Sequence, residues 1–166
     1  MVKLTKILNI LNSTKLNTDK HSIKQAIFSG DYELFKELLN NSYCDINAFD
    51  EEYRTLLDYA VLSRNIDIIA FLLARKAKLG TLFYSIHEEE DFIEKVEDLY
   101  ESGFDLNSHD KLGFSAIHYA SSLGFSGAVK YLLDLNVRMS NSAFNGETAI
   151  NLELEEHKVG VYIGTA

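Results

Sequence analysis

The sequence predicts an all-α solenoid, a stack of similar units that each contain two antiparallel helices. The first observation is internal repetition: SAIHYASSLGFSGAVKYLLDLNVRMS from Ser115 recurs in altered form as TLLDYAVLSRNIDIIAFLLARKAKLG from Thr55. The second is that apolar residues in both copies recur at helical spacing. The third is composition, because 166 residues that are 46% hydrophobic and contain no Pro offer no linker between domains. We therefore expect one elongated domain whose units share their stability with their neighbours.

Two further copies extend the repetition. A loose copy, HSIKQAIFSGDYELFKELLNNSYCDIN, starts at His21 and carries one extra residue near Tyr43. Another copy, LFYSIHEEEDFIEKVEDLYESGFDLN from Leu82, keeps the second helix but has acids where the turn between the helices should lie. A fragment, TAINLELE from Thr148, begins one more unit.

The spacing of the copies is regular except at one junction. Leu82 to Ser115 and Ser115 to Thr148 are each 33 residues, whereas Thr55 to Leu82 is only 27. Gly80 therefore runs almost directly into the next helix, and we expect an irregular stacking between the second and third units.

These features together resemble the ankyrin repeat, a unit of about 33 residues with a T-P-L-H-x-A start, a turn Gly, a Leu pair and a terminal Asn. The resemblance covers about residues 21–154. The consensus Pro is absent throughout, and the consensus His survives as His118 but is Asp58 in the second unit. The turn Gly survives as Gly30 and Gly124, whereas Arg64 replaces it in the second unit and leaves the geometry of that turn open.

The frame of the repeat divides the chain into an array and two ends. The predicted parts are an N-terminal capping helix at 1–20, units at 21–54, 55–81, 82–114 and 115–147, a partial unit at 148–154, and a C-terminal cap or tail at 155–166. The predicted core is apolar and recurs in every unit: Ile23, Ala26, Leu34, Leu38, Leu39, Leu57, Ala60, Ile68, Ile69, Leu72, Leu73, Ile93, Val96, Leu99, Ile117, Ala120, Val129, Leu132 and Leu133.

Between units, the resemblance implies projecting β-turn fingers. NSHDKLGFS at 107–115 fits one, and Asp110 and Gly113 supply its turn chemistry. NAFDEEYRT at 47–55 is a second finger with Tyr53 at the Gly position, and SNSAFNGET at 140–148 is a third.

The resemblance also implies a partner-binding concave face, built from the fingers and the outward positions of the first helices. Those positions are rich in aromatic and apolar side chains, which are common interface anchors. The candidate partner-binding residues are Phe28, Phe49, Asp50, Glu51, Glu52, Tyr53, Tyr59, Leu62, His109, Leu112, Tyr119 and Leu123. The alternative is that neighbouring units or the N-terminal helix cover several of them.

Charge narrows the class of partner. With 25 acids against 16 basic residues and a net charge of −9, the chain repels phosphate backbones, so nucleic acid is not an expected ligand. Acids cluster at Asp50–Glu52, at Glu88–Asp91 and near the C-terminal end. Such clusters are solvated faces or surfaces that steer a basic protein partner. No run reaches the roughly 18 apolar residues of a membrane span.

The N-terminal segment leaves three interpretations. Leu4, Ile7, Leu8 and Leu11 form one helical stripe, which favours a capping helix. The same stripe beside three lysines could instead meet a partner or a membrane surface, or serve as a transit segment.

Catalysis has little support, and we expect no enzyme, no metal and no cofactor. The chain has no phosphate-binding Gly loop, nucleophile elbow or paired metal-ligand motif. His118 matches the structural His of the family, and Cys44, the single cysteine, is read as a small loop residue in a reducing, cytoplasmic compartment. A weak enzyme hypothesis places a site around His87 and Glu88–Glu90.

We therefore expect a non-catalytic module, monomeric when free, that binds a protein partner. The narrower hypothesis is an inhibitor or immunity-type protein that masks a basic partner. The alternative is a secreted effector or regulatory scaffold that recruits a host or cellular protein. A structural hypothesis lets VGVYIGTA from Val159 pack on another copy of the chain.

Overall fold

The computed structural model describes residues 21–110 and 113–139, and within those residues it is all helical, with no strand. The helices follow each other as residues 21–29, α2 (Tyr32–Asn41), α3 (Leu56–Leu62), α4 (Ile66–Ala74), the 3-10 turn η1 (Phe83–Ser85), α5 (Glu89–Glu101), α6 (Ala116–Ser122) and α7 (Ser126–Asp134). The predicted all-α solenoid is confirmed. The predicted capping helix at 1–20, the third finger, the partial unit and the C-terminal end lie outside the described residues.

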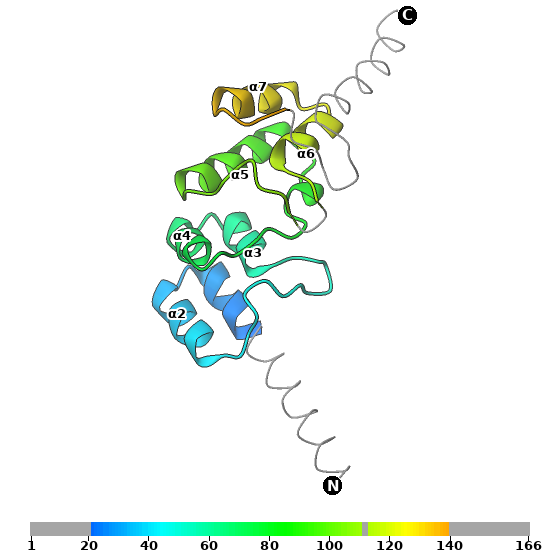
Figure 1. Ribbon diagram of the computed structural model, residues 1–166. Coiled ribbons are helices and arrows are strands. Elements are labelled where there is room, and N and C mark those ends of the chain that lie inside the picture. Colours follow the sequence, from blue (N-terminus) through cyan, green and yellow to red (C-terminus); the bar gives the residue numbers. More distant parts are fainter. Residues whose placement is uncertain (1–20, 111–112, 140–166) are drawn as a thin grey trace, which may run out of the picture.

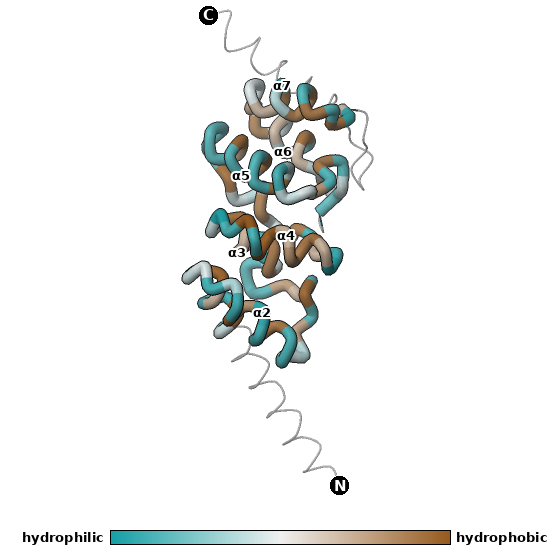
Figure 2. Tube along the Cα trace, turned by 90° about the vertical axis from the view of Figure 1, so that its left-hand side faces the viewer, coloured by the Kyte–Doolittle hydropathy of each residue, from teal (hydrophilic) through white to brown (hydrophobic). Residues whose placement is uncertain are grey.

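The helices stack along one axis in two columns. Figure 1 shows α2, α4, α5 and α7 along one side, with α3 and α6 beside them on the other. The finger at 47–55 projects from the α3 side as an open loop (Figure 1). In the tube of Figure 2, apolar segments gather where stacked helices face each other, and α4 is apolar along most of its length.

Each complete unit is a helical hairpin closed by one residue in the left-handed region. Gly30, Arg64 and Gly124 have φ values of 71°, 53° and 70°. The next amide then donates to a buried alanine carbonyl five residues earlier, as from Asn65 to Ala60 at 3.1 Å. The turn that the sequence left open at Arg64 thus has the same geometry as its two glycine counterparts. Small alanines at the crossing let the two helices approach closely.

Polar side chains begin most of these helices. Asp31 accepts from the amide of Leu34 at 2.9 Å, and Asn65 accepts from that of Ile68 at 3.2 Å. Thr55 and Ser115 begin α3 and α6 with capping boxes. In each box, the side chain of the residue three positions later accepts from the backbone amide of the cap residue. Capping boxes therefore support the starts of α3 and α6, where the consensus Pro is absent.

The third unit departs from this pattern. Its first helix is reduced to the three-residue turn η1, and the chain continues extended through Ile86 and Glu88 into the 13-residue helix α5. The irregularity expected between the second and third units is present, but its form differs from the expectation. Gly80 leads into a single 3-10 turn, because only residues 81–88 lie between Gly80 and α5, too few for a seven-residue helix and the turn after it.

The predicted core is largely buried. Leu57, Ile69, Leu72 and Leu132 are fully buried, as are most of the other predicted positions. Leu34 and Leu133 were assigned to the core, and this is wrong: they are 42% and 41% exposed, respectively. Successive helical residues point about 100° apart, so Leu133 turns toward solvent because Leu132 is buried, and Leu34 does so because Phe35 is buried.

Candidate functional site

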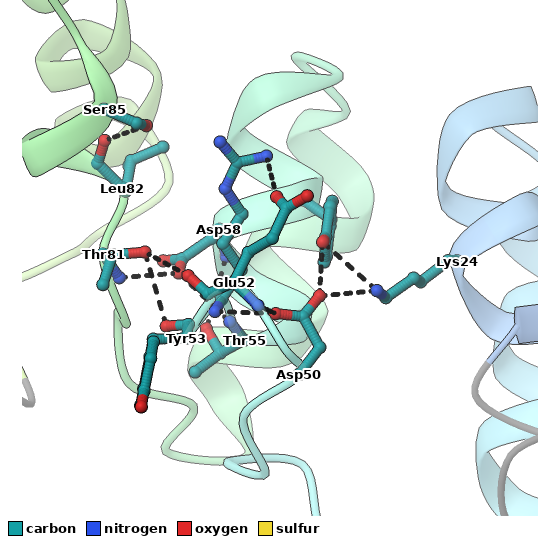
Figure 3. Close-up of polar contacts among 11 residues, drawn as sticks. Lys24, Asp50, Glu52, Tyr53, Thr55, Asp58, Thr81, Leu82 and Ser85 are labelled. Atoms are coloured by element: carbon teal, nitrogen blue, oxygen red, sulfur yellow. Dashed lines mark hydrogen bonds and ion pairs between the residues drawn. The ribbon is translucent and has the colours of Figure 1, made fainter.

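The finger at 47–55 is held by one carboxylate. Asp50 Oδ1 accepts from the amides of Glu52 and Arg54 at 2.9 and 3.0 Å, which closes the turn. Its Oδ2 accepts from the Tyr59 hydroxyl and from Lys24 Nζ, the latter at 2.6 Å (Figure 3). Burial opposes the ionisation of Asp50, but the hydrogen bonds from Lys24 and Tyr59 outweigh it and hold its pKa well below its usual range. Asp50 is therefore an ionised structural residue.

The finger before α6 repeats this design. Asp110 Oδ1 accepts from the amide of Phe114 at 3.0 Å, and Oδ2 accepts from the Tyr119 hydroxyl at 2.6 Å. Burial and the hydrogen bond to Asp110 both raise the pKa of Tyr119. In both fingers a carboxylate and a tyrosine nine residues later lock the turn to the helix that follows.

This bonding corrects the expected binding stripe. Tyr59 and Tyr119 were expected to be exposed on the concave face, but each is only 7% exposed. Their hydroxyl groups donate to the finger carboxylates, and their rings are buried within the array. The Asp50 carboxylate, also expected at the binding face, already binds Lys24 and Tyr59 within the chain.

Other expected contact residues do reach solvent. Phe28, Tyr53 and Leu123 are 59%, 64% and 39% exposed. Glu51 and Glu52 are exposed on the finger, where Glu52 pairs with Arg54 at 3.1 Å. The remaining expected residues are half-buried, namely Phe49, Leu62 and His109, while Leu112 lies outside the described residues.

Ring contacts link two of the exposed side chains to neighbouring residues of the array. The ring centroid of Phe28 lies 5.6 Å from that of Tyr59, and that of Phe49 lies 6.0 Å from that of Tyr53. The Thr81 hydroxyl donates to the carbonyls of Glu52 and Tyr53 at 3.1 and 3.4 Å, which ties the finger to the connection before the third unit (Figure 3).

A pocket of about 440 Å³ opens between the third and fourth units. Tyr84, His87 and Phe114 line it from the third unit, and Tyr119 and Leu123 line it from the fourth. Of these residues, Tyr119 and Leu123 were expected on the binding face, whereas Tyr84 and Phe114 were not among the expected site residues. The signal that could have found them is the loss of helical pattern over residues 82–88, since a missing helix exposes what it would have covered.

Two of the acids near His87 have partners within the protein. Glu89 Oε1 accepts from the amide of Ala128 at 2.9 Å, at the start of α7. Asp91 Oδ1 pairs with Lys95 Nζ at 2.9 Å. Throughout residues 21–110 and 113–139, no three His, Cys, Asp or Glu side chains are grouped to hold a metal ion. Glu89 and Asp91 thus have structural partners.

The fourth-unit histidine lies at the helix start. His118 is fully buried, and its Nδ1 accepts from the Ser115 amide at 3.1 Å. This arrangement matches the structural role that the sequence indicated for it. In the second unit the corresponding residue is Asp58, which is treated below.

Known proteins with similar sequences agree with this architecture. A family pattern described as "Ankyrin repeats (many copies)" matches residues 23–73. Proteins named as ankyrin repeat proteins from Rickettsia felis and from fowlpox virus are each 28% identical over 81% and 79% of this chain. A third, from Acanthamoeba polyphaga mimivirus, is 37% identical over 39% of it. The aligned regions cover 34% of the Rickettsia felis protein, 33% of the fowlpox virus protein and 9% of the mimivirus protein.

Proposed function

We propose that the chain, which is similar to ankyrin repeat proteins, binds a protein partner on the side formed by its first helices and fingers. Ankyrin repeats generally mediate protein–protein interaction and carry no chemistry of their own. The observation that supports this side is the exposure of Phe28, Tyr53 and Leu123, three large apolar side chains. Exposed aromatic and aliphatic side chains that gather on one side are typical interface anchors.

The charge of the chain favours a basic partner. The net charge is −9, and Glu51 and Glu52 are exposed at the tip of the finger beside Tyr53. Charges of this kind raise the association rate with an oppositely charged partner and set its orientation more than they raise affinity. Masking such a partner, as an inhibitor does, is the narrower form of the proposal, and recruiting it as a scaffold or effector is the other.

Compartment and oligomeric state complete the proposal. A single cysteine, Cys44, fits a reducing compartment such as the cytoplasm. None of the helices in the described part of the chain is both long and apolar enough to cross a membrane. We expect a monomer in the absence of the partner, which the solution mass at two concentrations tests.

The test is capture of a partner from a lysate by two matched variants. The first combines Phe28→Ala, Tyr53→Ala and Leu123→Ala on the proposed side. The control combines Tyr43→Ala, Tyr100→Ala and Leu133→Ala, whose side chains are 90%, 51% and 41% exposed. Tyr59 and Tyr119 are unsuitable targets, because their loss would release the fingers.

A partner that the control retains and the first variant loses supports the proposed side. Loss by both variants, or by neither, overturns it. Reversal of Glu51 and Glu52 to Lys should then weaken a basic partner by about tenfold at low salt, with less effect at high salt. If the captured partner is an enzyme or toxin, its activity in the complex separates masking from recruitment.

A further inference from the structure

The pocket between the third and fourth units exists because one helix is missing. In the second and fourth units the first helix has seven residues, whereas in the third unit it is the three-residue turn η1. The chain after η1 runs extended through Ile86 and Glu88. The side of α6 near Tyr119 and Leu123 is therefore left open where a full helix would have covered it.

The walls of the pocket are aromatic and aliphatic. Tyr84 is 68% exposed and Leu123 is 39% exposed, and Phe114 packs between them and the interior, with its ring centroid 5.6 Å from that of Tyr119. A volume of about 440 Å³ falls within the range of roughly 300–1,000 Å³ in which ligand pockets occur. The space is thus large enough for a whole aromatic side chain.

Three polar groups of the walls bond within this chain. The Tyr119 hydroxyl donates to Asp110 at 2.6 Å, and the Ser122 hydroxyl donates to the Tyr119 carbonyl at 3.1 Å. His118 Nδ1 accepts from the Ser115 amide at 3.1 Å. The larger part of the surface that the pocket offers is apolar, made of ring faces and aliphatic groups, which favours an apolar side chain over a polar small molecule.

The surroundings of the pocket are acidic. Glu88 and Glu90 follow His87 directly and are exposed, and neither has an ion pair within the described residues. On the other flank, the Thr81 hydroxyl bonds to the Glu52 carbonyl at 3.1 Å, which brings the finger with Glu51 next to the segment that leads to Tyr84. An apolar pocket flanked by exposed carboxylates suits an apolar anchor that has cations beside it.

We propose that this pocket receives one aromatic or large aliphatic side chain from an extended segment of a partner protein that carries Lys or Arg on either side of that anchor. The inference rests on the proposed function and specifies the chemistry of the partner. The anchor buries its side chain against Tyr84, Phe114 and Leu123, and the flanking cations face Glu88, Glu90 and Glu51.

The test is selection of displayed 12-residue random peptides on the full chain, followed by anisotropy measurements with the enriched peptides. We expect enriched peptides to share one aromatic or large aliphatic residue within two positions of a Lys or Arg. Ser122→Trp, which fills the pocket from an exposed position, and Leu123→Ala should each weaken binding at least tenfold. The control Leu133→Ala removes an equally exposed leucine on α7 and should change binding less than twofold.

Three results of the peptide test overturn the inference. These are the absence of enriched peptides, enriched peptides without the expected pattern, and peptides that bind Ser122→Trp as tightly as the unaltered chain. A dimer that dissociates on Ser122→Trp also overturns it, because a second copy of the chain would then fill the pocket. The proposed function survives any of these if the lysate partner is still lost by the Phe28, Tyr53 and Leu123 variant and retained by its control.

Discussion

The second and fourth units share one frame at a constant offset of 60 residues. Leu56–Leu62 (α3) corresponds to Ala116–Ser122 (α6), and Ile66–Ala74 (α4) to Ser126–Asp134 (α7). Both fingers lock a carboxylate to a tyrosine nine residues later. In both, an Asn at the start of the finger accepts from a backbone amide 31 residues on, with N···O distances of 2.7 and 2.9 Å. The two units differ where they meet the third.

The residues that depart from the repeat consensus make those contacts. Asp58, at the position of His118, accepts from the amide of Gly80 in the shortened connection at 2.9 Å. It also accepts from the amide of Thr81 at 3.1 Å (Figure 3). Arg64, at the position of Gly124, forms a bidentate pair with Asp98 of α5 at 2.9 and 3.1 Å. Substitutions that look like degeneration in the sequence therefore hold a unit that has lost its finger and its first helix.

Helix α7 shows the same dependence from the other side. In the second unit Asn65 serves the Ile68 amide of its own helix at 3.2 Å. The equivalent cap residue in the fourth unit is Phe125, which makes no side-chain cap bond, and Glu89 of the third unit serves the Ala128 amide instead. The amide at the first turn of a second helix can therefore find its acceptor in its own unit or in a neighbouring one.

The largest expected effect breaks the junction that distinguishes the second unit. In Gly80→Ala, the added Cβ would lie 2.4 Å from the Tyr53 carbonyl oxygen and 2.6 Å from Asp58 Oδ2, so the finger or the connection must move. We expect a loss of about 3 kcal/mol in the free energy of unfolding by urea. Gly127→Ala is the control, because its Cβ would meet only the flexible end of Glu89 at 3.0 Å. Equal stabilities for the two variants would contradict this role of Gly80.

The second prediction concerns pH and the Asp58/His118 difference. Burial raises the pKa of Asp58 to about 6, although amide donors from Gly80, Thr55 and Thr81 oppose the shift. The folded state therefore holds this proton more tightly than the unfolded chain, whose carboxyl has a pKa of about 3.9. Its contribution to stability is present in full below pH 4 and is lost as the pH rises through 6.

The shift corresponds to at most about 3 kcal/mol of unfolding free energy between pH 7 and pH 4. Urea unfolding of the unaltered chain and of Asp58→Asn across this range measures it. We expect the variant to lose most of the pH dependence. A variant whose stability still rises as steeply toward pH 4 would assign the dependence to other acids.

A third, smaller effect compares the two ways of capping a second helix. Glu89→Ala leaves the Ala128 amide without its acceptor, and Asn65→Ala does the same to the Ile68 amide. We expect each to lower the free energy of unfolding by about 1 kcal/mol, and Glu89→Gln, which keeps an acceptor oxygen, to cost less. If Glu89→Ala unfolds like the unaltered chain, the dependence of α7 on the third unit is refuted.

The smallest expected effect is that of Arg64→Gly. Glycine relieves the left-handed strain at φ 53° but removes the pairs with Asp98 and Glu94, so the two changes oppose each other. Arg64→Ala keeps the strain and loses the same pairs, so it should be less stable than Arg64→Gly in thermal unfolding. The reverse order would show that backbone strain at this turn is negligible.

The sequence by itself determined the repeat frame, the all-α class, the fingers and most of the core, because apolar periodicity and turn residues are local properties of the chain. It also placed Phe28, Tyr53 and Leu123 on the surface, where all three are exposed. It could not show that Tyr59 and Tyr119 turn inward, because each hydroxyl donates to a carboxylate in the finger that precedes its helix. Only the tertiary structure decided that Glu89 caps another unit and that a lost helix opens a pocket, because both depend on how units stack.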